Sequence, residues 1–237
     1  MASSLFIWLG SGRARRRGVG EKGLLLDQAA RAGLPVPNGA ILLDELRLIF
    51  RDKGLIKGCN GRLIAPDPEL LHNTLFYSVR LPRFARAVAL RPAFAAPAAV
   101  PARLSVDLGD AVATAAALAA LWSGAELQPS GGRADLLVME MVTAQVAGTA
   151  LTNNMAAGRG APADEIKLRS GHVAPLSTLP RLTGWQSPNS DLPPFARRVQ
   201  MLLRGARRTF GPGMWQIEWI DDGQICYLVT AARATAP

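Results

Sequence analysis

The pattern of apolar and polar positions predicts a mixture of helices and strands. Four segments have the apolar period or the composition of helices, namely residues 22–32, 44–51, 107–123 and 194–210. Runs rich in β-branched and aromatic residues predict strands, and an Asp222-Gly223 turn is typical of a β-hairpin. These strands are expected at residues 4–9, 40–43, 75–80, 135–142, 146–152, 165–169, 214–220 and 224–229. Helices mixed with adjacent strand pairs predict the α+β class.

Two proline-rich segments interrupt this pattern. Residues 82–103 hold four prolines among many alanines, and residues 171–194 hold five more. Proline removes a backbone donor and fixes φ, so both segments are predicted to be loops.

The composition limits the class of protein. With 49% apolar residues the 237-residue chain has enough material for a real core. A net charge of +9 favours an anionic partner, which leaves nucleotides, nucleic acid, acidic membrane surfaces and acidic proteins open. Cys59 and Cys226 have no Cys or His at metal-ligand spacing, which argues against a zinc site and favours a reducing compartment. No apolar run reaches the roughly 18 residues of a membrane span.

The N-terminal segment also bears on location. An apolar SLFIWL stretch precedes the arginines at residues 13–17, whereas a secretory signal has its basic residues first. The first twenty residues contain Ser and Arg but no acidic residue, so an organelle transit peptide is an alternative. We favour a first strand followed by a basic loop, in a cytoplasmic protein.

A glycine-flanked lysine opens the first predicted helix. Lys22 lies between Glu21 and Gly23, shortly after Gly18 and Gly20. Glycine lets a backbone approach a ligand closely, a helix start offers free N–H groups, and a lysine suits a phosphate. The pattern fits a nucleotide site, and it equally fits an ordinary helix start with a solvated lysine.

Six short motifs follow one another in an order that one family shares. They are GEKG with GLPVPNG (residues 20–23 and 33–39), SVR (78–80), Phe94, LWS (121–123), VMEMV with AGTALT (138–142 and 147–152), and TFGP, QIEW and Arg233 (209–212, 216–219 and 233). In this order the chain resembles the N-terminal ATP-binding domain of phosphoenolpyruvate synthase and pyruvate phosphate dikinase, an ATP-grasp-like domain. The resemblance covers nearly the whole chain.

The resemblance implies an α+β, ATP-grasp-like fold in which two subdomains with mixed or antiparallel sheets surround a nucleotide cleft. Residues 1–130 would form the N-terminal, lysine-bearing subdomain. Residues 131–237 would form the C-terminal grasp subdomain, with the hinge strand, the last helix and the final hairpin.

The resemblance also implies roles for individual residues. Lys22 and Arg80 would contact phosphates, and Arg80 and Arg233 would act on the transferred phosphoryl group. Glu218 and Gln216 would hold Mg²⁺, so ATP and Mg²⁺ are the expected cofactors. The adenine would lie against the hinge strand, formed by Met139, Glu140, Met141 and Val142.

The chain departs from the family pattern at residues that would bind the metal and the phosphates. Gln216 stands where the family has an acid, which removes one negative charge from the metal site. The serines after the arginine are Leu81 and Pro82, and the glycine-bearing phosphate loop is Ala95-Ala96-Pro97. Gly171-His172 lacks the surroundings of the family's phosphorylated histidine, so a separate histidine-domain or pyruvate-domain protein is the expected partner.

Three functions follow from these observations. The first is an ATP-dependent phosphotransferase domain, a kinase of the dikinase type, whose acceptor is supplied by another domain or chain. The second is a catalytically decayed ATP-grasp-like module with a structural or regulatory role. The third is a nucleic-acid binder that uses the arginines of residues 13–17 and 197–208, which is least favoured because no reader motif accompanies them.

Overall fold

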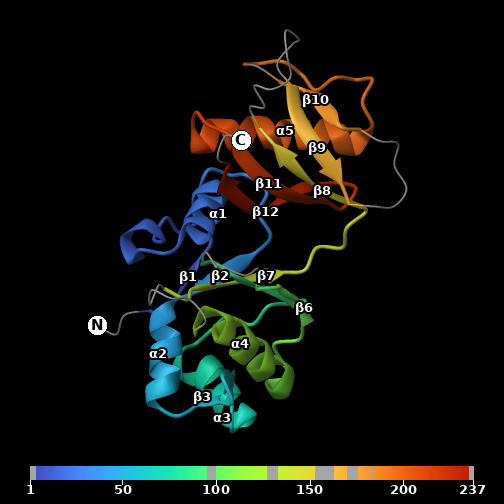
Figure 1. Ribbon diagram of the computed structural model, residues 1–237. Coiled ribbons are helices and arrows are strands. Elements are labelled where there is room, and N and C mark those ends of the chain that lie inside the picture. Colours follow the sequence, from blue (N-terminus) through green and yellow to red (C-terminus); the bar gives the residue numbers. More distant parts are fainter. Residues whose placement is uncertain are drawn as a thin grey trace. The chain divides into compact units, whose positions relative to one another are not determined.

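The computed structural model describes residues 4–94, 100–126, 133–152, 163–169, 176–182 and 184–234 (Figure 1). The chain divides into two compact units. Unit 1 consists of Met1–Leu24 and Asn38–Met141, and unit 2 consists of Leu25–Pro37 and Val142–Pro237. The helix α1 (Glu21–Arg31) therefore begins in unit 1 and ends in unit 2.

Unit 1 is built on a five-stranded antiparallel sheet with the order β1-β2-β7-β5-β6. The central strands of this sheet are buried, because helices cover the sheet. These helices alternate with the strands along the chain. The strands are β1 (Phe6–Trp8), β2 (Gly39–Leu42), β5 (Val88–Pro92), β6 (Arg103–Val106) and β7 (Leu136–Glu140). The other elements are a 3-10 turn (Arg15–Arg17), α2 (Asp44–Asp52), the hairpin β3 (Lys57–Cys59) and β4 (Arg62–Ile64), α3 (Pro68–Asn73), a π-helical turn (Thr74–Ser78) and α4 (Ala111–Glu126).

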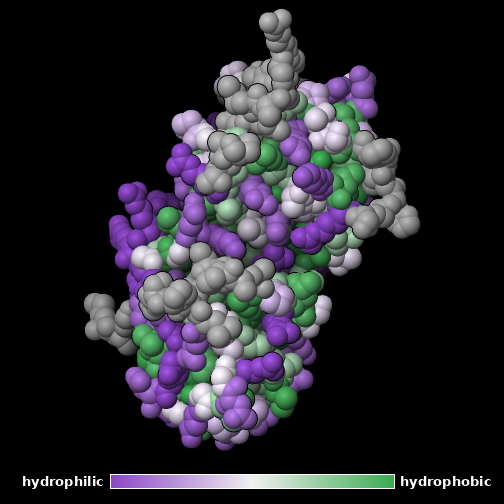
Figure 2. All heavy atoms as spheres, viewed as in Figure 1, coloured by the Kyte–Doolittle hydropathy of each residue, from purple (hydrophilic) through white to green (hydrophobic). Residues whose placement is uncertain are grey.

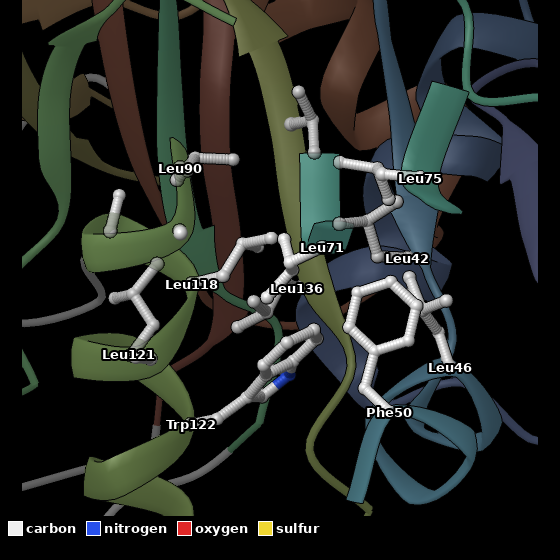
Figure 3. Packing of buried hydrophobic residues seen from close by; sticks show 14 of the residues in the cluster. Leu42, Leu46, Phe50, Leu71, Leu75, Leu90, Leu118, Leu121, Trp122 and Leu136 are labelled. Carbon is white, nitrogen blue, oxygen red and sulfur yellow. The ribbon is translucent and has the colours of Figure 1, made fainter. Parts of the chain in front are cut away.

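The core of unit 1 lies between this sheet and its helices (Figure 3). Trp122 of α4 is fully buried, and its ring meets the Phe50 ring edge-on at 6.1 Å. The indole N–H of Trp122 donates to the carbonyl of Ala134 at 3.3 Å, so its polar atom is satisfied inside the core. Leucines from several elements surround this pair, as Figure 3 shows.

Unit 2 is built on a second five-stranded antiparallel sheet, ordered β10-β9-β8-β11-β12. The end of α1 packs beside α5, where the Gln28 amide donates to the Thr209 carbonyl at 2.7 Å. Gly33 ends α1 with φ +80°, the left-handed conformation of a helix C-cap. The elements of unit 2 are β8 (Val146–Leu151), β9 (Ala163–Leu168), β10 (Thr178–Pro180), α5 (Pro194–Phe210), β11 (Trp215–Asp221) and β12 (Cys226–Arg233).

The α+β class is confirmed, and most predicted elements lie where the pattern placed them. The four predicted helices and the β11–β12 hairpin are present. The strand predicted at residues 75–80 is wrong, because Leu71, Leu75 and Phe76 are buried at helical spacing. The Val79 N–H donates to the Thr74 carbonyl at 3.0 Å, which continues α3 as a π-helical turn.

The loop predicted at residues 82–103 contains a strand instead. β5 pairs with β7 on one side and β6 on the other, and Val88 and Leu90 are fully buried. The only proline inside β5 is Pro92, at its last residue, where a strand tolerates the missing N–H. This short apolar strand was not predicted, because the prediction rested on the proline content of the whole segment.

The units differ from the predicted subdomains. The predicted boundary between residues 130 and 131 lies outside the described residues, and the division there stays a prediction. β7, which was expected in the C-terminal part beside β8, lies in the unit 1 sheet because it pairs with β2 and β5. Residues 25–37 belong to unit 2, where Pro35 accepts a hydrogen bond from the Leu228 N–H at 2.8 Å.

Hydrophobic and hydrophilic residues are interspersed on the face shown in Figure 2. A few large apolar side chains are nevertheless exposed, and the extreme case is Trp185 at 98%. Within the described residues, every helix is too short or too polar to cross a membrane.

Candidate functional site

The start of α1 packs tightly against the chain that follows β5. A Cβ on Gly20 would lie 2.5 Å from the Ala93 carbonyl oxygen, closer than atoms approach. A Cβ on Gly23 would lie 2.6 Å from Val19 Cγ1 and 3.6 Å from the Ala93 Cβ. These two glycines of the sequence motif are therefore required for packing, and they bring the helix start onto the end of β5.

Lys22 is the second residue of α1 and is partly exposed. Its ammonium group has no hydrogen bond or ion pair with any residue that the structure describes. The first N–H groups of a helix carry a partial positive charge, to which this lysine adds a full one. The same helix start also carries an acid, because Glu21 is the first residue of α1.

The strand that leads to Ala93 carries an arginine, Arg91, which sequence analysis did not predict as a site residue. Arg91 belongs to β5, two residues before Ala93, and is partly buried. The predicted phosphate contact, Arg80, instead follows the π-helical turn, is exposed and has φ +60°. The signal that could have found Arg91 is the run Val88-Ala89-Leu90-Arg91, an apolar strand that ends in a single arginine.

A buried carboxylate holds this region together. Asp135 is 1% exposed, accepts the Asp44 N–H at 2.9 Å and the Gly20 N–H at 3.4 Å, and so binds the starts of α2 and α1. Arg133 donates to both oxygens of Asp135, at 2.7 and 3.1 Å, and also to Glu45 at 2.9 Å.

The pKa values in this cluster follow from the same contacts. The hydrogen bond with Asp135 raises the pKa of Arg133, and this outweighs the opposing effect of burial. Burial raises the pKa of Glu45. Hydrogen bonds and the charge of Arg133 lower it by more than burial raises it, so the net shift of the pKa is downward. Arg133 and Glu45 therefore both stay charged near neutral pH, and their contacts with Asp135 form a fixed scaffold.

The predicted hinge residues lie at the end of β7, the central strand of the unit 1 sheet, and directly after it. Met139 is buried, and the Glu140 carboxylate accepts the Asn38 side-chain N–H at 3.0 Å and the Ala85 N–H at 3.3 Å. The backbone N–H groups of Glu140 and Met141 donate to the carbonyls of Asn38 and Ala87, at 2.8 and 2.9 Å. In the described part of the chain the Val142 N–H has no such partner.

The two faces of the unit 2 sheet differ. Trp215, Ile217 and Trp219 of β11 are buried, and the Trp219 ring stacks on Phe195 of α5 at 6.3 Å. Side chains alternate along a strand, so Gln216 and Glu218 point to the other, open face. This alternation places the two predicted metal ligands on one face, two residues apart.

Arg233 lies on the opposite side of the sheet. It pairs with Trp215, whereas Glu218 pairs with Thr230 and Gln216 with Ala232. Directly paired residues of an antiparallel sheet share a face, so Arg233 shares the face of Trp215, at the end of β12. The register does not bring Arg233 to Gln216 and Glu218.

The open face offers few ligands for a metal. No group of three His, Cys, Asp or Glu that could hold an ion occurs within the residues that the structure covers. Glu218 lies 3.7 Å from Arg169, and Gln216 lines a hollow of about 210 Å³ with Glu165 and Lys167. One carboxylate and one amide suit a Mg²⁺ ion that takes most of its oxygens from phosphates and water.

The predicted residues thus fall into two groups. Those in unit 1 are Lys22, Arg80, Met139, Glu140 and Met141, and those in unit 2 are Val142, Gln216, Glu218 and Arg233. The predicted convergence of Lys22, Arg80 and Arg233 on one triphosphate stays a prediction. The replaced phosphate loop, Ala95-Ala96-Pro97, and Gly171-His172 lie outside the described residues.

Comparisons with known proteins give distant structural likenesses. No protein-family model and no curated protein matches the chain. A RimK domain ATP-grasp protein from Sphaerobacter thermophilus has a TM-score of 0.45 at 16% identity, over 95% of this chain and 62% of that one. D-alanine-D-alanine ligase from Helicobacter pylori has a TM-score of 0.44 at 9% identity, over 86% of this chain and 51% of that one.

A third solved structure is N5-carboxyaminoimidazole synthase from Aspergillus clavatus, in complex with ADP and 5-aminoimidazole ribonucleotide. Its TM-score is 0.41 at 11% identity, over 91% of this chain and 44% of that one. The chain therefore spans between 44% and 62% of the length of these three structures. None of the three is a phosphoenolpyruvate synthase or a pyruvate phosphate dikinase.

The α+β class predicted from the sequence is confirmed by the structure itself, with one five-stranded antiparallel sheet in each of two units.

Proposed function

We propose that the chain is an ATP-binding, ATP-grasp-like domain related to that of phosphoenolpyruvate synthase and pyruvate phosphate dikinase. The observation that carries this proposal is the start of α1. Two glycines pack it onto the end of β5, and the ammonium group of Lys22 and the guanidinium of Arg91 belong to these two elements. A helix start with added cations suits a chain of phosphates.

In this proposal Arg91, and not Arg80, is the arginine that contacts the phosphates. The family has this arginine at the end of a strand, and β5 is a strand that ends in Arg91-Pro92. Arg80 lies in a turn instead. Lys22 supplies a point charge, and a guanidinium such as that of Arg91 binds two phosphate oxygens at once.

The adenine is proposed to bind along Met139, Glu140, Met141 and Val142. The Val142 N–H has no partner in the described structure, so it is suited to donate to a ring nitrogen. Recognition through the backbone depends little on side-chain identity, which explains how methionines could occupy this segment.

The proposed metal ligands are Glu218 and Gln216. A Mg²⁺ ion bound there would neutralise charge on the β- and γ-phosphates. Glu218 would give the negative charge and Gln216 a neutral oxygen. A phosphoryl acceptor would come from a histidine-domain or pyruvate-domain partner.

A second candidate function is a catalytically decayed module that retains nucleotide binding for assembly or regulation. The replacement of an acid by Gln216 favours it, because the metal site loses a charge. The register that places Arg233 with Trp215 favours it too, because the proposed transfer arginine is then missing from the face of Glu218.

Isothermal titration with Mg-ATP tests the proposed function. Lys22→Ala is expected to weaken binding about tenfold, since one charge-assisted contact contributes on the order of 1.5 kcal/mol. Lys53→Ala, which removes an exposed lysine of the same unit, serves as the matched control and should leave the affinity unchanged.

Absence of saturable binding by the wild type would contradict the proposal, as would an equal loss in both lysine variants. A titration without Mg²⁺ separates the two candidates. A phosphotransferase should bind ATP more tightly with Mg²⁺, whereas affinity that is independent of Mg²⁺ would favour the decayed module.

A further inference from the structure

Unit 2 contains a large apolar hollow that the proposed function does not use. Its volume is about 600 Å³, within the range of small-molecule sites. Residues from α5, the β11–β12 turn and the segment after α1 line it, among them Leu34, Met201 and Ile225. Met201 and Ile225 are each about two-fifths exposed, so apolar side chains face solvent at this hollow.

The walls of the hollow are held by hydrogen bonds. The carbonyl of Pro35 accepts the Leu228 N–H at 2.8 Å, which fixes the segment after α1 to the sheet. The Asp222 carboxylate accepts the N–H groups of Gln224 and Ile225 at 2.8 and 2.7 Å, which fixes the turn. The hollow is therefore formed before any ligand arrives, and a ligand would not need to order its walls.

Two neighbouring arginines line the hollow, and they differ. Arg198 donates to both oxygens of the buried Asp221, at 2.6 and 2.7 Å, so its charge is compensated. The Arg197 guanidinium has neither a hydrogen bond nor an ion pair with any part of the chain that the structure describes. The hollow thus combines apolar walls with one uncompensated cation.

The thiol at the base of the hollow adds no charge. Burial raises the pKa of Cys226, so the thiol stays protonated and acts as a small apolar wall.

We propose that this hollow binds a small amphiphilic monocarboxylate, a molecule with one carboxylate and an apolar chain or ring. The apolar part would lie against Leu34, Met201 and Ile225, and the carboxylate would accept hydrogen bonds from Arg197. A guanidinium matches a carboxylate with two parallel N–H donors. A phosphate would carry nearly twice the charge against a single uncompensated arginine, and the apolar walls would remain unused.

Isothermal titration with decanoate, below the concentration at which it forms micelles, tests this inference. The wild type is expected to bind one decanoate saturably. Decanol, which lacks the charge, and acetate, which lacks the apolar chain, should each bind about tenfold more weakly or worse. Arg197→Gln should weaken decanoate about tenfold and leave decanol unaffected.

Two further variants make the test specific. Arg208→Gln removes an exposed arginine of the same helix that does not line the hollow, and its decanoate affinity should match the wild type. Met201→Glu places a negative charge in the wall and should weaken decanoate binding.

The inference is overturned by a wild type that does not bind decanoate, by unchanged binding in Arg197→Gln, or by equal losses in Arg197→Gln and Arg208→Gln. Titration with Mg-ATP is the independent readout. Neither Lys22 nor Glu218 lines the hollow, so failure of either ligand to bind leaves the other result intact.

Discussion

Replacing Trp122 by alanine is expected to lower the free energy of unfolding of unit 1 by about 3–5 kcal/mol. Trp122 is 0% exposed, its ring packs on Phe50, and its indole N–H donates to Ala134. Alanine would leave a cavity of nearly the whole indole and an unpaired carbonyl. Because helix and sheet both contact the ring, neither can move in to fill the space without breaking other contacts.

Urea denaturation followed by circular dichroism measures this effect. Trp185→Ala is the matched control, because that tryptophan is 98% exposed and its loss should change stability by less than about 0.5 kcal/mol. Equal stabilities of the two variants would show that α4 does not pack on the sheet as described.

Replacing Asp135 by alanine is expected to cost about 3 kcal/mol of stability. The change leaves the N–H groups of Asp44 and Gly20 without their acceptor and takes a partner from Arg133. Arg133 is 33% exposed and keeps Glu45 as a partner, so its charge remains solvated and the loss is smaller than for a fully buried pair.

The same urea titration measures the loss, with Asp52→Ala as the control. Asp52 is exposed at the end of α2, so its removal should have little effect. Asp135→Asn keeps an acceptor oxygen but not the charge, and it should fall between the wild type and Asp135→Ala. An alanine variant as stable as the wild type would contradict the scaffold role of Asp135.

Local signals predicted much of the fold. The Asp222-Gly223 pair predicted the hairpin of β11 and β12 from sequence, because Asp and Gly favour a tight turn between two strands; in the structure residues 222–225 connect them. Gly33 predicted the end of α1 for the same reason, since a positive φ suits glycine.

Long-range pairing could not be predicted. β7 and β8 are neighbours in sequence, yet they belong to different sheets, because β7 pairs with β2 and β5. That choice depends on strands about 50 and 100 residues away, and no local pattern encodes it. Because β5 was not predicted from the sequence, its pairing with β7 could not be predicted either.

The candidate site shows this limit clearly. Lys22 was found because the glycines around it form a local motif, and the structure shows that Gly20 and Gly23 pack against neighbouring atoms that leave no room for a Cβ. Arg91 was missed because it lies in a segment that proline content marked as loop. The side on which Arg233 lies depends on the register of β11 and β12, which the sequence does not specify.

The central claim is that the start of α1 and the end of β5 form a phosphate site. The most direct measurement is the Mg-ATP affinity of Arg91→Gln beside that of Arg80→Gln, by isothermal titration with circular dichroism as the check on folding. We predict about tenfold weaker binding for Arg91→Gln and wild-type binding for Arg80→Gln. Wild-type affinity in Arg91→Gln, with the fold intact, would contradict the claim.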